Sequence, residues 1–180
     1  MNREEIRTAQ LVDAEAIVTL VNQAYRPDTG AVGWTHEANW VSGSRISVDQ
    51  VMDLLLKPDS TILLEIVNSA IIACVHIEKH GNICDIGMLA VNPTLQVTGI
   101  GKQMLAHAEH YARTQYSAEK FAMFVVSSRI ELIAFYVRRG YQKTGVVMDY
   151  PMTAGVGIPK YSGMTIEVLE KLACSIQPDV

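Results

Sequence analysis

The chain has 180 residues, of which 49% are hydrophobic and 19% are charged, and its formal net charge at pH 7 is −4. This length and composition suit one compact domain over residues 1–180 and argue against extensive disorder. Because no cluster of lysine or arginine marks a basic groove, we expect no nucleic-acid partner.

The first half of the chain predicts three strands and two helices. They are a strand at 6–9, a helix at 14–24, a helix that Ser47 and Asp49 begin and that ends at 56, and a hairpin with strands at 61–67 and 71–78. The first helix carries an apolar stripe at helical spacing, and Asp13 is placed to cap it. Residues 27–47 form a polar and aromatic connector, and Asn68-Ser69 predicts the hairpin turn.

The second half continues this pattern. We expect a strand at 83–91, a helix at 99–114, a strand at 120–127, a helix that Ser127 or Ser128 caps and that runs to 139, and strands at 144–148 and 164–169 around a glycine-rich loop at 151–163. Two strands joined by a helix are expected to be parallel neighbours. The sequence therefore predicts an α/β fold with a mixed sheet of about six or seven strands flanked by helices.

The three cysteines, Cys74, Cys84 and Cys174, are odd in number and scattered. They predict neither a disulfide framework nor a metal site. Residues 1–5 lack the apolar core of a signal peptide, and no apolar stretch approaches the roughly 20 residues that span a bilayer. We therefore expect a cytoplasmic protein with no membrane contact.

The most informative segment is the loop between the strand at 83–91 and the following helix. The strand stops at Asn92-Pro93, and a Gln96-x-x-Gly99-x-Gly101 loop opens directly into the helix. Backbone N–H groups that are unpaired at the start of a helix, where the helix dipole is positive, form a phosphate-binding site. The glycine spacing fits neither a Walker loop nor the dinucleotide-binding fingerprint. A plain tight turn is the alternative.

This strand–loop–helix frame resembles the acyl-CoA-binding motif of the GCN5-related N-acetyltransferase (GNAT) family. A second segment, in which Tyr136 precedes the Gly140-Tyr141 pair by four residues, matches another motif of that family. The resemblance implies a GNAT-like fold whose strands at 83–91 and 120–127 part at one end. It also implies acetyl-CoA as the co-substrate, with no metal.

Site residues follow from the same resemblance. The loop would hold the CoA pyrophosphate, the main chain of the strand would bond the pantetheine arm, and Tyr136 would protonate the departing thiolate. The predicted cofactor-binding residues are Leu89, Ala90, Val91, Gln96, Val97, Thr98, Gly99, Ile100, Gly101 and Lys102. Relatives often have an asparagine where this chain has Arg129, so Arg129 receives no role. Without the motif, Tyr136 reads as a core aromatic residue.

The family transfers the acetyl group directly in a ternary complex, so no cysteine nucleophile is needed and Cys84 is expected to pack in the core. Asp85 and Glu78 are candidate general bases that would accept a proton from the ammonium group of the acceptor. Each is also consistent with an ordinary hydrogen-bonded carboxylate. Asp85 is expected to share a face with Gly87, Leu89 and Val91 because strand side chains alternate. Glu78 shares a face with His76, which reads more simply as a sheet residue.

The connector walls the acceptor pocket in relatives, so Trp34 and Glu37 are the candidate substrate-binding residues, on either a lid or a packed connector. The predicted function is acetyl transfer from acetyl-CoA to a primary amine of a small molecule or peptide. The alternative is a CoA-binding sensor or structural subunit that has no transferase activity. A third possibility is that the acceptor is an amine of a protein. Homodimerisation is common in relatives and stays open here.

Overall fold

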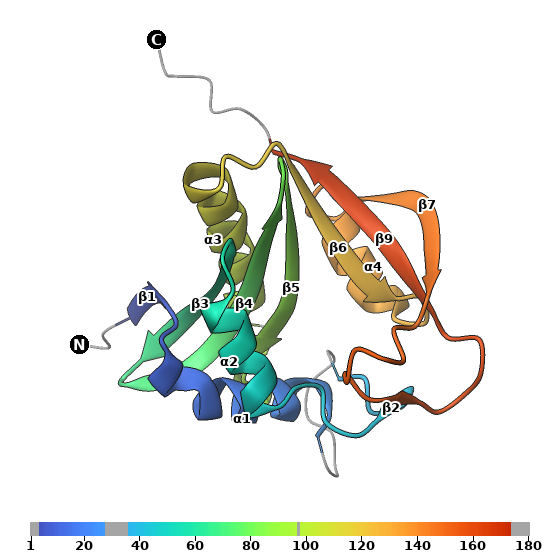
Figure 1. The fold of residues 1–180 in the computed structure, drawn as a ribbon, viewed down its shortest axis with the longest axis horizontal. Coiled ribbons are helices and arrows are strands. Elements are labelled where there is room, and N and C mark those ends of the chain that lie inside the picture. The colour runs from blue at the N-terminus through green and yellow to red at the C-terminus, as the bar shows by residue number, and fades with distance from the viewer. Residues whose placement is uncertain (1–3, 28–35, 97, 174–180) are drawn as a thin grey trace.

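The computed structural model describes residues 4–27, 36–96 and 98–173, which form a seven-stranded mixed sheet with helices on both faces (Figure 1). The strands are β1 (Glu4–Thr8), β2 (Val41–Ser42), β3 (Ser60–Val67), β4 (Ala70–His80), β5 (Ile83–Val91), β6 (Lys120–Val126), β7 (Gln142–Asp149), β8 (Ile158–Pro159) and β9 (Thr165–Leu172). The helices are α1 (Ala14–Tyr25), α2 (Val48–Leu56), α3 (Ile100–Gln115) and α4 (Ile130–Val137).

The order of strands in the large sheet is β1-β3-β4-β5-β6-β9-β7, and the short strands β2 and β8 pair separately. All pairs in the large sheet are antiparallel except β5 with β6. One apolar core lies between the sheet and α3 and α4, and a second lies between the other face and α1 and α2. The predicted α/β class and the parallel central pair are confirmed. No helix of the described residues is long and apolar enough to cross a membrane.

Two of the predicted helix starts need correction. Ser47 caps α2 as expected, because its hydroxyl accepts a hydrogen bond from the Gln50 amide. Asp13 is the N-cap residue of α1 but makes no side-chain cap; its carboxylate instead accepts hydrogen bonds from the Arg7 side chain and the Gln10 amide. This arrangement ties β1 to the turn that precedes α1.

Helix α4 begins at Ile130 and ends at Val137, so it is shorter than predicted and neither Ser127 nor Ser128 caps it. The two hydroxyls are used elsewhere: Ser127 accepts a hydrogen bond from Thr165, and Ser128 hydrogen-bonds the Tyr161 hydroxyl. These serines therefore fasten the end of β6 to the C-terminal segments instead of starting the helix.

A β-bulge interrupts the pairing of β4 with β5. Cys74 pairs with Ala90 and His76 pairs with Gly87, so two residues of β5 face a single residue of β4 between them. Met88, inside this interval, has a φ of 49°. A bulge adds one residue to one strand, so side chains on its two sides no longer follow a single alternation.

The bulge changes which face of the sheet each predicted residue occupies. Ile86 packs in the core under α3, and beyond the bulge Val91 packs there too, with Leu89 against it. Ala90 belongs to the core under α1. Asp85, next to Ile86, therefore points to the α1 side, and the prediction that it shares a face with Leu89 and Val91 is wrong.

Strands β5 and β6 separate along their length. They pair only at Ile83–Lys120, Cys84–Phe121 and Asp85–Ala122, and Figure 1 shows them diverging from that end. The predicted splay between these strands is therefore present. Cys84 lies at the closed end and is fully buried in the core, as predicted.

Candidate active site

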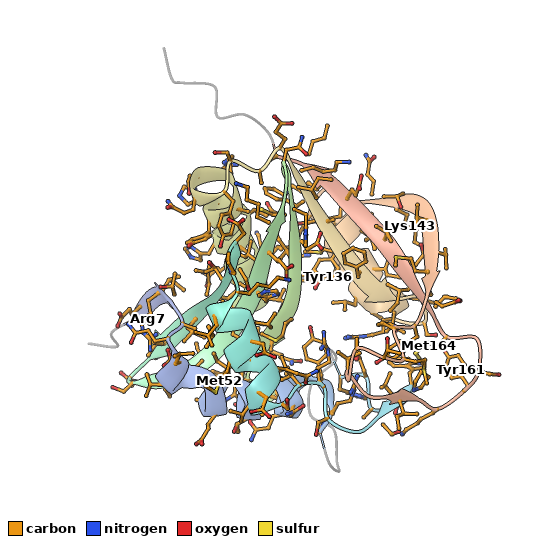
Figure 2. The ribbon with its side chains drawn as sticks, viewed as in Figure 1. Arg7, Met52, Tyr136, Lys143, Tyr161 and Met164 are labelled. Atoms are coloured by element: carbon orange, nitrogen blue, oxygen red, sulfur yellow. The ribbon has the colours of Figure 1, made fainter. Side chains whose placement is uncertain are left out.

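Two neighbouring cavities lie at the splay. The first, which we call the helix cavity, has a volume of about 500 Å³ and lies at the N-terminus of α3. The second, the strand cavity, has a volume of about 240 Å³ and is lined mainly by β4, β5 and β6. Four residues line both cavities: Tyr25, Arg129, Leu132 and Tyr136. Figure 2 shows Tyr136 between β5 and β6. The two cavities therefore meet where the strands part.

The helix cavity is built to receive an anion. Helix α3 starts after Gly99, whose φ is 97° and which has no side chain to cap the helix. A Cβ added to Gly99 would meet nothing within 4 Å, so the approach to the helix start is open. Four cationic side chains and one acidic side chain line the cavity: Lys102, Arg129, Arg138, Arg139 and Glu131. An uncapped helix start surrounded by cations favours bound phosphate groups.

The predicted loop and strand residues divide into two groups. Leu89, Val91, Gln96, Gly99, Gly101 and Lys102 line the helix cavity. The side chains of the others point elsewhere: the Thr98 hydroxyl donates to the Leu95 carbonyl, Ile100 packs against the core beneath α3, and Ala90 packs under α1. Val97 and Trp34 lie outside the described residues.

Tyr136 is a buried phenol with a free hydroxyl at the junction of the cavities. Its side chain is 6% exposed, and its ring packs edge-on against Phe135 and Tyr141. Among the residues that the structure describes, none hydrogen-bonds its hydroxyl. Burial raises the pKa of Tyr136 well above its usual range. Its hydroxyl therefore stays protonated and is able to donate a hydrogen bond or a proton.

The two candidate bases both line the strand cavity but differ in their surroundings. Lys57 Nζ lies 2.5 Å from the Glu78 carboxylate, and His80 Nε2 lies 3.2 Å away. Burial alone would raise the pKa of Glu78, but the hydrogen bond and charge of Lys57 bring it below its ordinary value. Burial raises the pKa of Asp85, whose neighbour His80 lies 3.3 Å away. Asp85 is therefore the better proton acceptor of the two.

Glu37 lies in the wall of the strand cavity, but two arginines engage its carboxylate. Arg26 Nη2 donates to Oε2 at 2.8 Å, and Arg129 Nη1 donates to Oε1 at 3.1 Å. The side chains of Arg26, Glu37 and Arg129 are 6%, 9% and 3% exposed. Arg26 also donates to the Gly43 and Val156 carbonyls. This buried ion trio joins the connector and the 151–163 loop to the start of α4.

Sequence reasoning missed two polar residues of the strand cavity, Tyr25 and Arg45. The Tyr25 hydroxyl donates to the Leu89 carbonyl at 3.1 Å, and the guanidinium groups of Arg45 and Arg129 lie over its ring. Tyr25 is the last residue of α1, 64 positions before its partner. No local motif signals such a contact.

His76 behaves as a structural residue. Its Nε2 lies 2.9 Å from the Ser60 hydroxyl, and burial lowers its pKa to about 4. The ring is therefore neutral at physiological pH and adds no charge to the strand cavity. This agrees with the simpler reading of His76 as a sheet residue.

Comparison with known proteins identifies the fold and the family. The structure resembles the ribosomal-protein-S18-alanine N-acetyltransferase from Escherichia coli, with a TM-score of 0.71 and 13% identity over 99% of both chains. An N-acetyltransferase from Staphylococcus aureus Mu50 has a TM-score of 0.71 and 17% identity over 95% of this chain and 98% of that one. The PaiA N-acetyltransferase from Thermoplasma acidophilum was solved in complex with coenzyme A. Its TM-score is 0.70, with 16% identity over 94% of this chain and 99% of that one.

At these identities the solved structures establish the fold, and no curated protein matches the sequence. The family comes from the sequence itself, because residues 16–141 match the Acetyltransferase (GNAT) family. This match spans more than half of the 180 residues. The chain therefore belongs to the GNAT family of acetyl-CoA-dependent N-acetyltransferases.

Proposed function

We propose that the chain transfers the acetyl group of acetyl-CoA to the primary amine of a small acceptor by direct attack in a ternary complex. The observation that carries the proposal is the junction of the helix cavity and the strand cavity at Tyr136. One cavity suits a phosphate-bearing ligand, and the other offers the Asp85 carboxylate to an ammonium. Because they share a wall, both ligands would meet at the splay.

The helix cavity fits the diphosphate of coenzyme A. The uncapped start of α3 offers backbone N–H groups at the positive end of the helix dipole, and Lys102 adds a charge in the first turn. The pantetheine arm would pass Leu89 and Val91, where the edge of β5 that faces β6 is not paired with that strand. The bound co-substrate supplies an activated acetyl thioester.

In this proposal Asp85 accepts a proton from the acceptor ammonium, directly or through a water molecule, so that the free amine can attack. Tyr136 holds its proton beside the departing sulfur and donates it as the carbon–sulfur bond breaks, and the second proton that the attacking nitrogen loses restores the Tyr136 hydroxyl. Arg129 and Glu37 are positioning residues, because their ion pair fixes the start of the helix that carries Tyr136. No covalent acyl-enzyme is needed.

The test measures CoA-thiol release from acetyl-CoA across a panel of primary amines. The Tyr136→Phe substitution is expected to lower kcat roughly 100-fold or more, since general acid catalysis contributes on that order. Binding of coenzyme A should be unchanged. Tyr116→Phe is the matched control, because the Tyr116 hydroxyl bonds Thr61, and neither residue lines the two cavities.

Equal turnover by the wild type and Tyr136→Phe would remove Tyr136 from the mechanism. Coenzyme A binding without transfer to any amine would instead favour the CoA-binding sensor.

A further inference from the structure

Most ionisable groups of the strand cavity already have partners within the protein. Glu37 is paired with Arg129, and Glu78 is paired with Lys57. His76 is neutral at physiological pH because burial lowers its pKa to about 4. Arg45 and Asp85 are the two charged groups that remain.

Arg45 presents its guanidinium to the cavity without a counter-ion. Within the described ranges, no carboxylate pairs with it and no acceptor hydrogen-bonds its side chain. Its contact is with the face of the Tyr25 ring, 5.5 Å from the centroid. Its backbone is held in place, because the Asn22 side chain accepts hydrogen bonds from the Arg45 and Ile46 amides at 2.7 and 3.3 Å. A fixed backbone and a stacked guanidinium make Arg45 a preorganised cation.

Asp85 is the complementary anion. It enters the cavity from β5, whereas Arg45 enters from the connector before α2. Its one ion-pair contact among the described residues is with His80, whose side chain is 53% exposed. The cavity therefore offers one cation and one anion from separate elements, a pattern complementary to a zwitterion.

We propose that the acceptor is a free amino acid, whose carboxylate is bound by Arg45 while its ammonium faces Asp85. This inference rests on the proposed function and adds the substrate class to it. Arginine suits the role because its planar fork binds a carboxylate with two parallel hydrogen bonds. Arg129 does not compete for the carboxylate, because Glu37 already accepts a hydrogen bond from it.

The size of the strand cavity supports a small acceptor. Its volume of about 240 Å³ lies below the roughly 300–1,000 Å³ of typical small-molecule pockets. A peptide or protein amine would place its carboxylates far from the reacting nitrogen and would leave Arg45 without a partner. A buried or half-buried cation without a partner weakens binding, so the cavity selects against such acceptors.

The experiment compares three acceptor sets with the full-length wild-type enzyme: amino acids, their C-terminal amides and the corresponding decarboxylated amines. We expect kcat/KM for the best amino acid to exceed that of its amide at least tenfold. Arg45→Gln should raise KM for the amino acid about 10- to 100-fold, equivalent to about 1.4–2.8 kcal/mol. It should leave kcat within about twofold and should not change KM for the amide.

Arg45→Lys keeps the charge but loses the fork, so it should recover part of the affinity for the amino acid. Arg113→Gln is the control for loss of one positive charge, because Arg113 lies near the C-terminal end of α3, away from both cavities. Coenzyme A affinity, measured by calorimetry, should be the same in all variants.

Equal kcat/KM for amino acids and amides in the wild type would overturn the assignment of Arg45 while leaving the transferase intact. The same conclusion would follow if Arg45→Gln weakened coenzyme A and every acceptor alike, since that is the effect of a structural residue. Coenzyme A binding with no transfer to any of the three sets would overturn the proposed function as well.

Discussion

The buried ion trio gives the sharpest prediction about Glu37. In Glu37→Gln the side chain keeps its shape but loses the one negative charge that Arg26 and Arg129 share. Removing one partner of a buried ion pair costs about 3–5 kcal/mol, because the remaining charge stays buried. The two guanidinium groups are 6% and 3% exposed, which places this site in the buried class.

Arg26 keeps its hydrogen bonds to the Gly43 and Val156 carbonyls, so we expect the lower end of that range, about 3 kcal/mol. For a chain of this size each kcal/mol shifts Tm by roughly 2–4 °C, which gives a fall of about 6–12 °C. Differential scanning calorimetry, with urea unfolding at 25 °C, measures both quantities.

Glu167→Gln is the matched control, because it breaks the salt bridge to Lys143, whose side chain is 50% exposed. Exposed pairs contribute at most about 1 kcal/mol, so its Tm should fall by no more than about 4 °C. The interpretation of Glu37 as a positioning residue is refuted if Glu37→Gln keeps the wild-type Tm but loses turnover. That result would make Glu37 a direct substrate contact, as the sequence first suggested.

Three other predictions follow from the strand cavity, the 151–163 loop and β1. Asp85→Asn should lower kcat/KM about 100-fold and remove the acidic limb of its pH profile, which lies above the ordinary Asp pKa because burial raises it. An unchanged limb would exclude Asp85 as base. In Gly157→Ala the new Cβ would lie 2.7 Å from a β2 carbonyl oxygen, so urea unfolding should show a loss of about 1–3 kcal/mol beyond that of Gly145→Ala, whose Cβ meets open space. The hydrogen bond from Arg7 lowers the pKa of Asp13, so its stabilisation holds above about pH 4 and is lost as pH falls. Asp13→Asn should flatten this acid part of the stability curve, and an unaltered curve would contradict the assignment.

The sequence predicted the elements because hydrophobic periodicity and glycine turns are local signals, and the resemblance to the GNAT family implied the central splay. The register of strand pairing is not a local signal. The bulge at Met88 reverses the alternation along β5, and nothing in the apolar pattern from Ile83 to Val91 marks it, since both faces of this strand are buried. The strand was therefore predicted correctly, but the face of the sheet on which the Asp85 side chain lies was predicted incorrectly.

The same distinction applies to the site. The loop at Gly99 and the tyrosine at 136 belong to short motifs and could be found from the sequence. The pairing of Glu37 with Arg129 spans 92 positions, and the Arg45 guanidinium lies over the ring of Tyr25. Such contacts depend on tertiary packing, which composition and spacing do not encode.

The central claim is that the start of α3 binds the diphosphate of coenzyme A. Isothermal titration calorimetry of the wild type with coenzyme A and with pantetheine, which lacks the diphosphate, tests it most directly. We predict that coenzyme A binds at least about tenfold more tightly, because charge-assisted hydrogen bonds to the α3 amides and Lys102 act only on the phosphates. Equal affinities for the two ligands, or no heat with coenzyme A, would contradict the account.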